Sequence, residues 1–247
     1  MKRKNIISRR TAIVTGLSSL GALLLPGCSN SHPPTYGNIL RMGDWFTYNA
    51  QRALLPGQSL AKEYESRDIS SFPATGTVNP GDNIFGDSNE EYAKLQRGAF
   101  ADWSLSVEGR VARPGTYSLS QLQNFPPRTQ ITRHTCEEGW TAIGQWTGVP
   151  LGNILEHAGI YPSARFVNFF SYDGWGDSID MLDAFHPQTL LAYGMNGRDL
   201  PIQHGAPLRL RVERQIGYKS MKYLQRIVVT DEYIDPGDTG WAWYVGI

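Results

Sequence analysis

Alternating hydrophobic and polar residues mark the segments that we expect to form β-strands. Trp103, Leu105 and Val107 alternate with polar residues, which is typical of a strand with one buried face. Residues 208–213 alternate in the same way, with aliphatic side chains on one face and charged side chains on the other. The other expected strands are residues 130–136, 165–171, 190–195 and 224–230. The pattern therefore predicts a body built mainly from strands.

Helical patterns are short by comparison. The expected helices are residues 45–55, one turn near residues 89–95, residues 120–125 and residues 150–158. The last of them has Pro150 at its first turn and Gly159 just past its end, as helix termini commonly do. Asn196-Gly197 predicts a tight turn after the strand at 190–195. The predicted fold class is α+β, mostly strands with short surface helices.

The N-terminus has the pattern of an export signal. Residues 1–27 carry five basic side chains and no acidic one, and the apolar run 11–25 is shorter than the roughly 20 residues of a membrane span. Arg9-Arg10 resembles a twin-arginine signal, and residues 25–28 resemble a lipoprotein cleavage box with Cys28 as the lipidated residue. A plain cleaved signal and an uncleaved anchor are the alternatives. Each of them predicts a body outside the cytoplasm.

Charge and domain organisation follow from this assignment. The whole chain has a formal net charge of zero, but without residues 1–27 it has 18 basic and 23 acidic side chains, which gives −5. An acidic body argues against a nucleic-acid partner. We expect a tether and N-terminal arm at residues 28–71, and one folded domain at residues 72–247.

The chain has two cysteines, and lipidation of Cys28 would leave Cys136 without a disulfide partner. Cys136 lies where the strand at 130–136 ends, a position from which a rigid support often displays a functional group. Its thiolate can act as a nucleophile or as a soft metal ligand. A nucleophile needs a base, and His134, His157, His186 and His204 are the candidates, among which spacing does not choose. A buried core cysteine is the remaining alternative.

A basic segment stands out in this acidic body. Residues 204–226 hold six Lys or Arg residues and one acidic residue. The segment is either a solvated strand face or an anion clamp, in which Arg209, the turn at residues 217–220 and Lys219 hold a phosphate. The spacing does not match a nucleotide-binding P-loop.

Three motifs then give a family resemblance: RHTCEEGW at residue 133, AFHPQTLLAYGMNG at residue 184 and HGAPLRLRVERQIGYKSMKY at residue 204. In this order they resemble the bacterial branch of the sulfite-oxidase-like molybdopterin enzymes, over roughly residues 100–232. The chain is similar, more distantly, to the molybdenum protein-methionine-sulfoxide reductases. The resemblance implies a sulfite-oxidase molybdopterin-binding fold and a molybdenum–molybdopterin cofactor.

The resemblance also implies residue roles. Cys136 matches the metal-ligating cysteine, and Glu138 matches a glutamate close to the metal. The residues implied to contact the cofactor are Thr75, Ser171, His204, Arg209, Ser220, Met221 and Lys222. Thr75 is a departure, since relatives have an asparagine after the phenylalanine of this loop, and Glu137 stands where a small apolar residue is common. Substrate contacts are expected in the loop at residues 171–178.

The implied activity is two-electron oxygen-atom transfer in the periplasm, either S-oxide or N-oxide reduction or a sulfite-type oxidation. The expected electron partner is a membrane or soluble cytochrome. A monomer is expected, because no residues remain for the C-terminal β-sandwich domain of sulfite oxidases. The alternatives are a cofactor-free envelope thiol enzyme that uses Cys136, which lacks the expected His-Gly-Cys arrangement, and a non-catalytic ligand-binding lipoprotein.

Overall fold

The computed structural model describes residues 59–83 and 86–234, together with residues 42, 46, 49, 50 and 52–54. The predicted signal, Cys28 and most of the tether lie outside these residues. The chain divides into two compact units, Met1–Gly43 and Asp44–Ile247, so part of the predicted arm belongs to the same unit as the predicted domain. No helix among the described residues has the length and apolar character that a membrane crossing requires.

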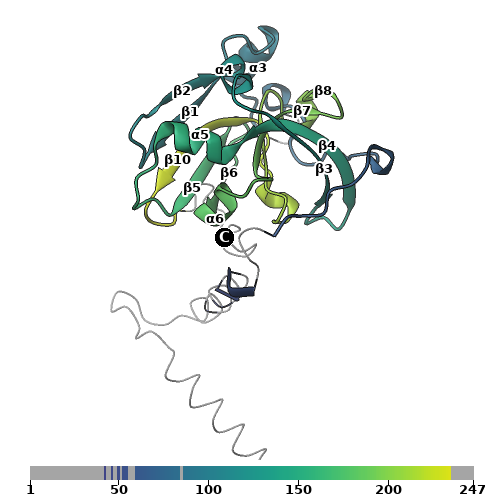
Figure 1. The fold of residues 1–247 in the computed structure, drawn as a ribbon. Coiled ribbons are helices and arrows are strands. Elements are labelled where there is room, and N and C mark those ends of the chain that lie inside the picture. The colour runs from purple at the N-terminus through teal and green to yellow at the C-terminus, as the bar shows by residue number, and fades with distance from the viewer. Residues whose placement is uncertain are drawn as a thin grey trace, which may run out of the picture. The chain divides into compact units, whose positions relative to one another are not determined.

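Two five-stranded sheets form the body (Figure 1). The first has the order β2-β1-β10-β5-β6, and β1 and β10 are parallel neighbours whereas the other pairs are antiparallel. Its strands are β1 (Ser104–Gly109), β2 (Gly115–Ser118), β5 (Phe166–Ser171), β6 (Gly176–Asp180) and β10 (Leu224–Thr230). This sheet carries the largest part of the hydrophobic core.

The second sheet is antiparallel throughout, with the order β3-β4-β7-β8 and with β9 paired to β7. Its strands are β3 (Arg128–Thr135), β4 (Thr141–Pro150), β7 (Leu190–Met195), β8 (Arg198–Asp199) and β9 (Arg209–Arg211). The β3–β4 hairpin is long, and its connecting loop begins at Cys136. This hairpin therefore places the thiol.

Short helices connect the strands, and side-chain caps define several of their starts. The α-helices are α3 (Glu90–Arg97), α4 (Leu119–Gln123), α5 (Leu151–Ala158) and α6 (Met181–Ala184). The 3-10 turns are η1 (Ser66–Asp68), η2 (Pro80–Asp82), η3 (Ile202–His204) and η4 (Gly217–Lys219). The Asn89 side chain caps α3 by accepting a hydrogen bond from a backbone N–H of its first turn. Ser118 and Gln121 form a capping box on α4, in which the side chain of each residue accepts from the backbone N–H of the other.

The main core lies between the first sheet and the segments around it. Trp103, Leu105 and Tyr92 are among its fully buried side chains. A smaller cluster on the second sheet contains Trp146 and Ala192, with Phe72 packed against it. The smaller cluster therefore brings Phe72, the first residue after the predicted arm, to the sheet that carries Cys136.

The structure confirms the predicted fold class of mostly strands with short helices. Each predicted strand is present, and helices lie at the four predicted positions as far as the residues are described. The sequence pattern did not reveal β2, β4, β6 or α6, whereas β8 is the extended segment expected after the Asn196-Gly197 turn. In β9 both faces are buried, so the expected charged face does not meet solvent.

Candidate cofactor site

A pocket of about 260 Å³ lies at the end of β3. Its lining comes from four segments, within residues 72–77, 134–140, 173–175 and 203–222. The predicted site residues that line it are Thr75, Cys136, Glu138, His204, Arg209, Ser220, Met221 and Lys222. The structure therefore gathers into one place residues that are up to 147 positions apart in sequence.

Cys136 occupies the first position of the β3–β4 loop. Its backbone N–H donates to the carbonyl of Trp140 across 2.9 Å, and its carbonyl accepts from Gly139 N–H at 3.1 Å, so the turn fixes the backbone of the cysteine. The side chain is buried, and burial raises the pKa of the thiol. A neutral thiol is a poor nucleophile, and a bound cation or metal would be needed to hold the thiolate.

Two carboxylates follow the thiol. Glu137 is exposed and accepts a hydrogen bond from Cys136 Sγ at 3.5 Å. Glu138, also exposed, accepts from Trp140 Nε1 at 2.9 Å. The mouth of the pocket is thus acidic on the side of the β3–β4 loop.

The pocket is also lined by cationic side chains, which form a cationic wall, and Arg209 is the most deeply buried of them. Arg209 is 4 % exposed, and its guanidinium donates to the carbonyls of His204 at 2.9 Å and Ser220 at 2.8 Å. Within the described part of the chain its Nε has no hydrogen-bond partner, and it forms no ion pair. Burial and the neighbouring Arg211 lower the pKa of Arg209 to about 9. A buried cation without a counter-ion favours an anionic ligand.

Lys222 and His204 extend this wall. Lys222 Nζ donates to the carbonyls of Thr75 at 2.8 Å and of Thr77, and burial and Arg209 lower its pKa to about 8. Burial, followed by Arg209 and Lys222, lowers the pKa of His204 to about 4. Burial is the main reason why these groups resist protonation, and the repulsion between cations placed close together adds to it. A phosphate bound there would relieve this repulsion.

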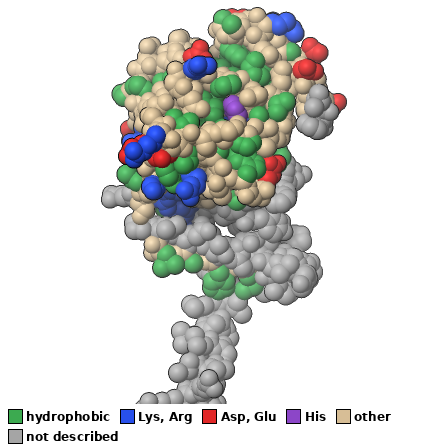
Figure 2. All heavy atoms as spheres, turned by 90° about the vertical axis from the view of Figure 1, so that its right-hand side faces the viewer, with side chains coloured by type: hydrophobic (Ala, Val, Ile, Leu, Met, Phe, Trp, Pro, Cys, Tyr) green, Lys and Arg blue, Asp and Glu red, His purple; other side chains and the backbone are tan. Residues whose placement is uncertain are grey.

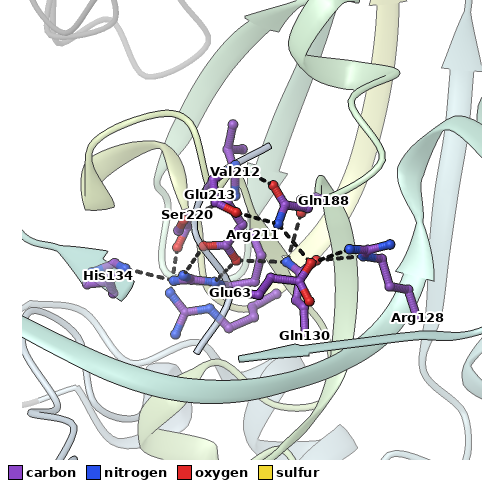
Figure 3. Close-up of polar contacts among 11 residues, drawn as sticks. Glu63, Arg128, Gln130, His134, Gln188, Arg211, Val212, Glu213 and Ser220 are labelled. Carbon is purple, nitrogen blue, oxygen red and sulfur yellow. Dashed lines mark hydrogen bonds and ion pairs between the residues drawn. The ribbon is translucent and has the colours of Figure 1, made fainter. Parts of the chain in front are cut away.

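A buried polar network supports the wall from behind (Figure 3). Arg211 and Glu213 form a two-pronged ion pair, with Arg211 Nε to Glu213 Oε1 at 3.0 Å and Nη2 to Oε2 at 2.9 Å. The third guanidinium nitrogen lies 2.7 Å from His134 Nδ1. Glu213 thus neutralises Arg211 and leaves Arg209 and Lys222 as the cations that line the pocket. The sequence marked this segment as basic but gave no sign of the pairing.

Ser171 and Lys219, both predicted to bind the cofactor, do not line the pocket. The single O–H of Ser171 has two acceptors within reach, the carbonyl of Trp175 at 2.8 Å from Oγ and the carboxylate of Asp173, and both of these residues do line the pocket. Lys219 is fully buried, with Nζ 2.8 Å from Asp177 Oδ1 and 2.8 Å from the carbonyl of Ser178. Because Lys219 forms an ion pair with Asp177, the position of its side chain does not support the phosphate-binding role predicted for it.

Figure 2 shows one face of the molecule, on which charged side chains lie towards the edges. Hydrophobic side chains, uncharged atoms and a histidine occupy its middle.

Aromatic rings are concentrated at the pocket. The Phe72 ring lies between 5.2 and 5.7 Å from the rings of His134, Trp140, Trp146 and His204. The pocket therefore combines a cationic wall with an aromatic one.

A two-sheet body whose pocket combines a buried thiol with buried cationic side chains has the features expected of a molybdopterin-dependent oxidoreductase of the sulfite-oxidase type. Residues 93–237 match the family model described as an oxidoreductase molybdopterin binding domain, and the chain belongs to this family. The donor set fits the group, because Arg209 offers an unpaired buried N–H to a phosphate and Cys136 offers a soft sulfur to the metal.

Named relatives agree with this family. A putative protein-methionine-sulfoxide reductase subunit YedZ1 from Azospira oryzae is 34% identical over 97% of this chain and 88% of its own length. The catalytic subunit MsrP of protein-methionine-sulfoxide reductase from Xanthomonas campestris is 28% identical, over 83% of this chain and 65% of that protein. MsrP from Ralstonia nicotianae is 34% identical over 53% of this chain and 44% of its own length.

Among solved structures, the sulfane dehydrogenase SoxCD from Paracoccus pantotrophus superposes with a TM-score of 0.52 at 20% identity. The match covers 85% of this chain and 58% of that one. At this identity the similarity supports the fold alone.

Proposed function

We propose that this protein is an S-oxide reductase that acts on sulfoxides such as methionine sulfoxide, in proteins or as small molecules. The reaction takes up two electrons and two protons, breaks the S=O bond, and yields a thioether and water. The molybdenum centre, when bound, supplies the two-electron redox chemistry and the acceptor for the oxygen atom. The names of the curated relatives support this substrate class.

The observation that carries the proposal is the charge around the thiol. Glu137, Glu138 and Asp173 line the same pocket as Cys136. Carboxylates at the mouth disfavour the approach of an anion such as sulfite through like-charge repulsion, whereas a sulfoxide is neutral and is not repelled. The aromatic rings of Trp140 and Trp175, which also line the pocket, suit a thioether product, since sulfur packs well against ring edges.

The remaining parts of the proposal concern location and electron supply. We place the mature protein in the periplasm, exported as a folded protein by the Arg9-Arg10 signal and anchored by lipid on Cys28. Electrons then come from a separate cytochrome. The features that support this are the N-terminal sequence and the need to insert the cofactor before export.

Turnover with an artificial reduced donor tests the proposal. With this donor, purified protein should reduce methionine sulfoxide and related S-oxides faster than N-oxides. With an artificial electron acceptor in place of the donor, it should oxidise sulfite poorly. Cys136→Ser should abolish turnover and remove cysteinyl Mo–S scattering from the X-ray absorption spectrum. Sulfite oxidation that exceeds every S-oxide activity would contradict the substrate assignment.

The same preparation tests the cofactor-free alternative and the role of Cys136. Molybdenum-free protein with thiol-dependent acyl transfer would favour the cofactor-free enzyme. Retention of the full molybdenum complement by Cys136→Ser, with no loss of activity, would overturn the role of Cys136.

A further inference from the structure

Residues 59–77 join the end of the predicted N-terminal arm to the start of the predicted domain and are called the arm below. They supply one wall of the cofactor pocket although they precede the residues that match the family model. All residues from Phe72 to Thr77 line the pocket, whereas the family model matches residues 93–237. A ligand in the pocket therefore contacts the family domain and the arm at once.

The arm is attached to the body by separated contacts instead of a continuous ladder. Glu63 and Thr132 form an isolated β-bridge, and Tyr64 N–H donates to the carbonyl of Ile131 at 2.8 Å. Further along, Ser70 N–H donates to the carbonyl of Ile143 at 3.0 Å, and Ser70 Oγ accepts from Ile143 N–H at 2.9 Å. Few and isolated hydrogen bonds permit local opening at a lower free energy than unfolding of the sheets.

Two side chains of the body hold the arm upstream of the pocket. The Gln188 amide, which is fully buried, accepts from Ala61 N–H at 2.7 Å and donates to the Ala61 carbonyl at 3.0 Å. It also lies 2.9 Å from Glu63 Oε1, which accepts a second bond from Arg128. Figure 3 shows Glu63, Gln188 and Arg128 grouped together, next to Gln130.

Hydrogen bonds link this attachment to the cationic wall. Gln130 Nε2 donates to the Gln188 carbonyl at 3.0 Å and lies 3.0 Å from Glu213 Oε1. Glu213 is the partner of Arg211, which contacts His134 in the pocket lining. The place where the arm docks and the place where the cofactor binds thus share one buried network.

The pocket end of the arm is held by the groups that would hold the cofactor. Lys222 Nζ donates to the carbonyls of Thr75 and Thr77, and Tyr223 OH donates to the Thr77 carbonyl at 2.9 Å. The Phe72 ring packs on His134 and His204. The contacts that dock the arm therefore involve some of the same residues that form the cofactor wall.

We propose that residues 59–77 form a clasp that retains the molybdopterin cofactor, and that Glu63 and Ser70 are positioning residues that keep it closed. Opening the clasp exposes the pocket to an entering cofactor without unfolding either sheet. Closure adds the contacts of residues 72–77 to the bound group. Because the two events are linked, bound cofactor must stabilise the closed clasp as much as closure stabilises the bound cofactor. The inference depends on molybdopterin binding and not on the proposed substrate.

Cofactor release from purified holoprotein tests the clasp. Glu63→Ala and Ser70→Ala each remove arm contacts and line no part of the pocket. Ser70→Ala, which removes one hydrogen bond, should release pterin about fivefold faster. Glu63→Ala, which removes the bonds from both Gln188 and Arg128, should release it at least as fast, and the double variant faster still. The matched control is Arg67→Ala on the same arm, because Arg67 is 78% exposed and pairs only with exposed Glu65 among the described residues. Pterin fluorescence and molybdenum content after timed dialysis give the rates.

Hydrogen exchange supplies a readout that is independent of activity. Peptides covering residues 59–77 should exchange faster in cofactor-free protein than in holoprotein, and the β5 and β10 peptides should exchange alike in both. Wild-type pterin release by the double variant, or equal exchange of the arm in the two forms, would overturn the clasp. Faster release accompanied by faster exchange in β5 and β10 would also overturn it, because global unfolding would then explain the loss.

Discussion

Arg211 Nη1 donates a hydrogen bond of 2.7 Å to Nδ1 of His134, two residues before the thiol. Because Arg211 has only donors, Nδ1 must be the acceptor, and the neutral ring carries its proton on Nε2. Burial, with Arg211 and then Arg209, lowers the pKa of His134 to about 2. His134 is therefore a fixed neutral support of the pocket and not a general base for Cys136, which argues against the thiol-enzyme alternative.

The first prediction concerns the ion pair behind this histidine. Arg211→Met leaves the buried Glu213 carboxylate unpaired and should cost about 3–5 kcal/mol of unfolding free energy. The matched control is Arg226→Met, because the Arg226–Glu108 pair at 3.0 Å is more than 40% exposed on both sides and should contribute at most about 1 kcal/mol. Denaturant unfolding of both variants measures the difference. If the two variants lost equal amounts of unfolding free energy, the buried Arg211–Glu213 pair would stabilise the protein no more than the exposed Arg226–Glu108 pair.

A second prediction follows from the close approach of η4 to β3. A Cβ atom on Gly217 would lie 2.4 Å from His134 Nε2 and 2.9 Å from the carbonyl of Thr135. Gly217→Ala should therefore displace the end of β3, lower the stability by about 1–3 kcal/mol and reduce the molybdenum content. Gly115→Ala is the control, because no atom lies within 4 Å of its added Cβ. Unfolding curves and metal analysis of the two variants decide the outcome, and a normal metal content in Gly217→Ala would contradict it.

Particular residues show which features could be predicted from the sequence. Cys136 and Arg209 were found by their motifs, and the structure brings both to one pocket. Strand β4 was missed because Gly144 and Gly148 occupy buried positions of its alternation and hide the hydrophobic pattern. Neither glycine is a gap in the packing: a Cβ on Gly148 would lie 2.2 Å from the carbonyl of Leu191.

Buried charges were the other feature that the sequence concealed. Strand β6 is buried at every position although it contains Asp177, Ser178 and Asp180. These groups are tolerated because Lys219 and Arg52 pair with the two carboxylates. No local pattern identifies such partners, since they come from segments far away in sequence. For the same reason Lys219 and Lys222, three residues apart, could not be assigned different roles from sequence alone.

The third prediction is a pH dependence of the cofactor-free protein. His204 titrates near 6.5 when unfolded and, through burial, Arg209 and Lys222, its pKa is about 4 when folded. Between these values the unfolded chain binds a proton that the folded chain does not, so stability should fall as the pH decreases from 6.5 to 4. The contribution is at most about 1.4 kcal/mol per pH unit. Between pH 7, 6 and 5 the unfolding free energy should decline less steeply in His204→Gln than in the wild type. If the two pH profiles superimposed, protonation of His204 would not be a cause of the decline.

The last prediction separates a structural role for Lys219 from direct binding of the cofactor. Lys219→Met leaves Asp177 buried without its cation and should cost about 3–5 kcal/mol, with a loss of bound pterin. In Lys219→Met/Asp177→Asn the unpaired charge is gone, while the side-chain oxygen can still accept the 2.6 Å bond from Ser178 N–H. Stability and pterin content should then recover together, because no buried charge is left unpaired and Lys222 remains to contact the phosphate. Thermal unfolding and pterin fluorescence measure the two quantities. A double variant that is stable but lacks pterin would assign Lys219 to the cofactor, as its motif had suggested.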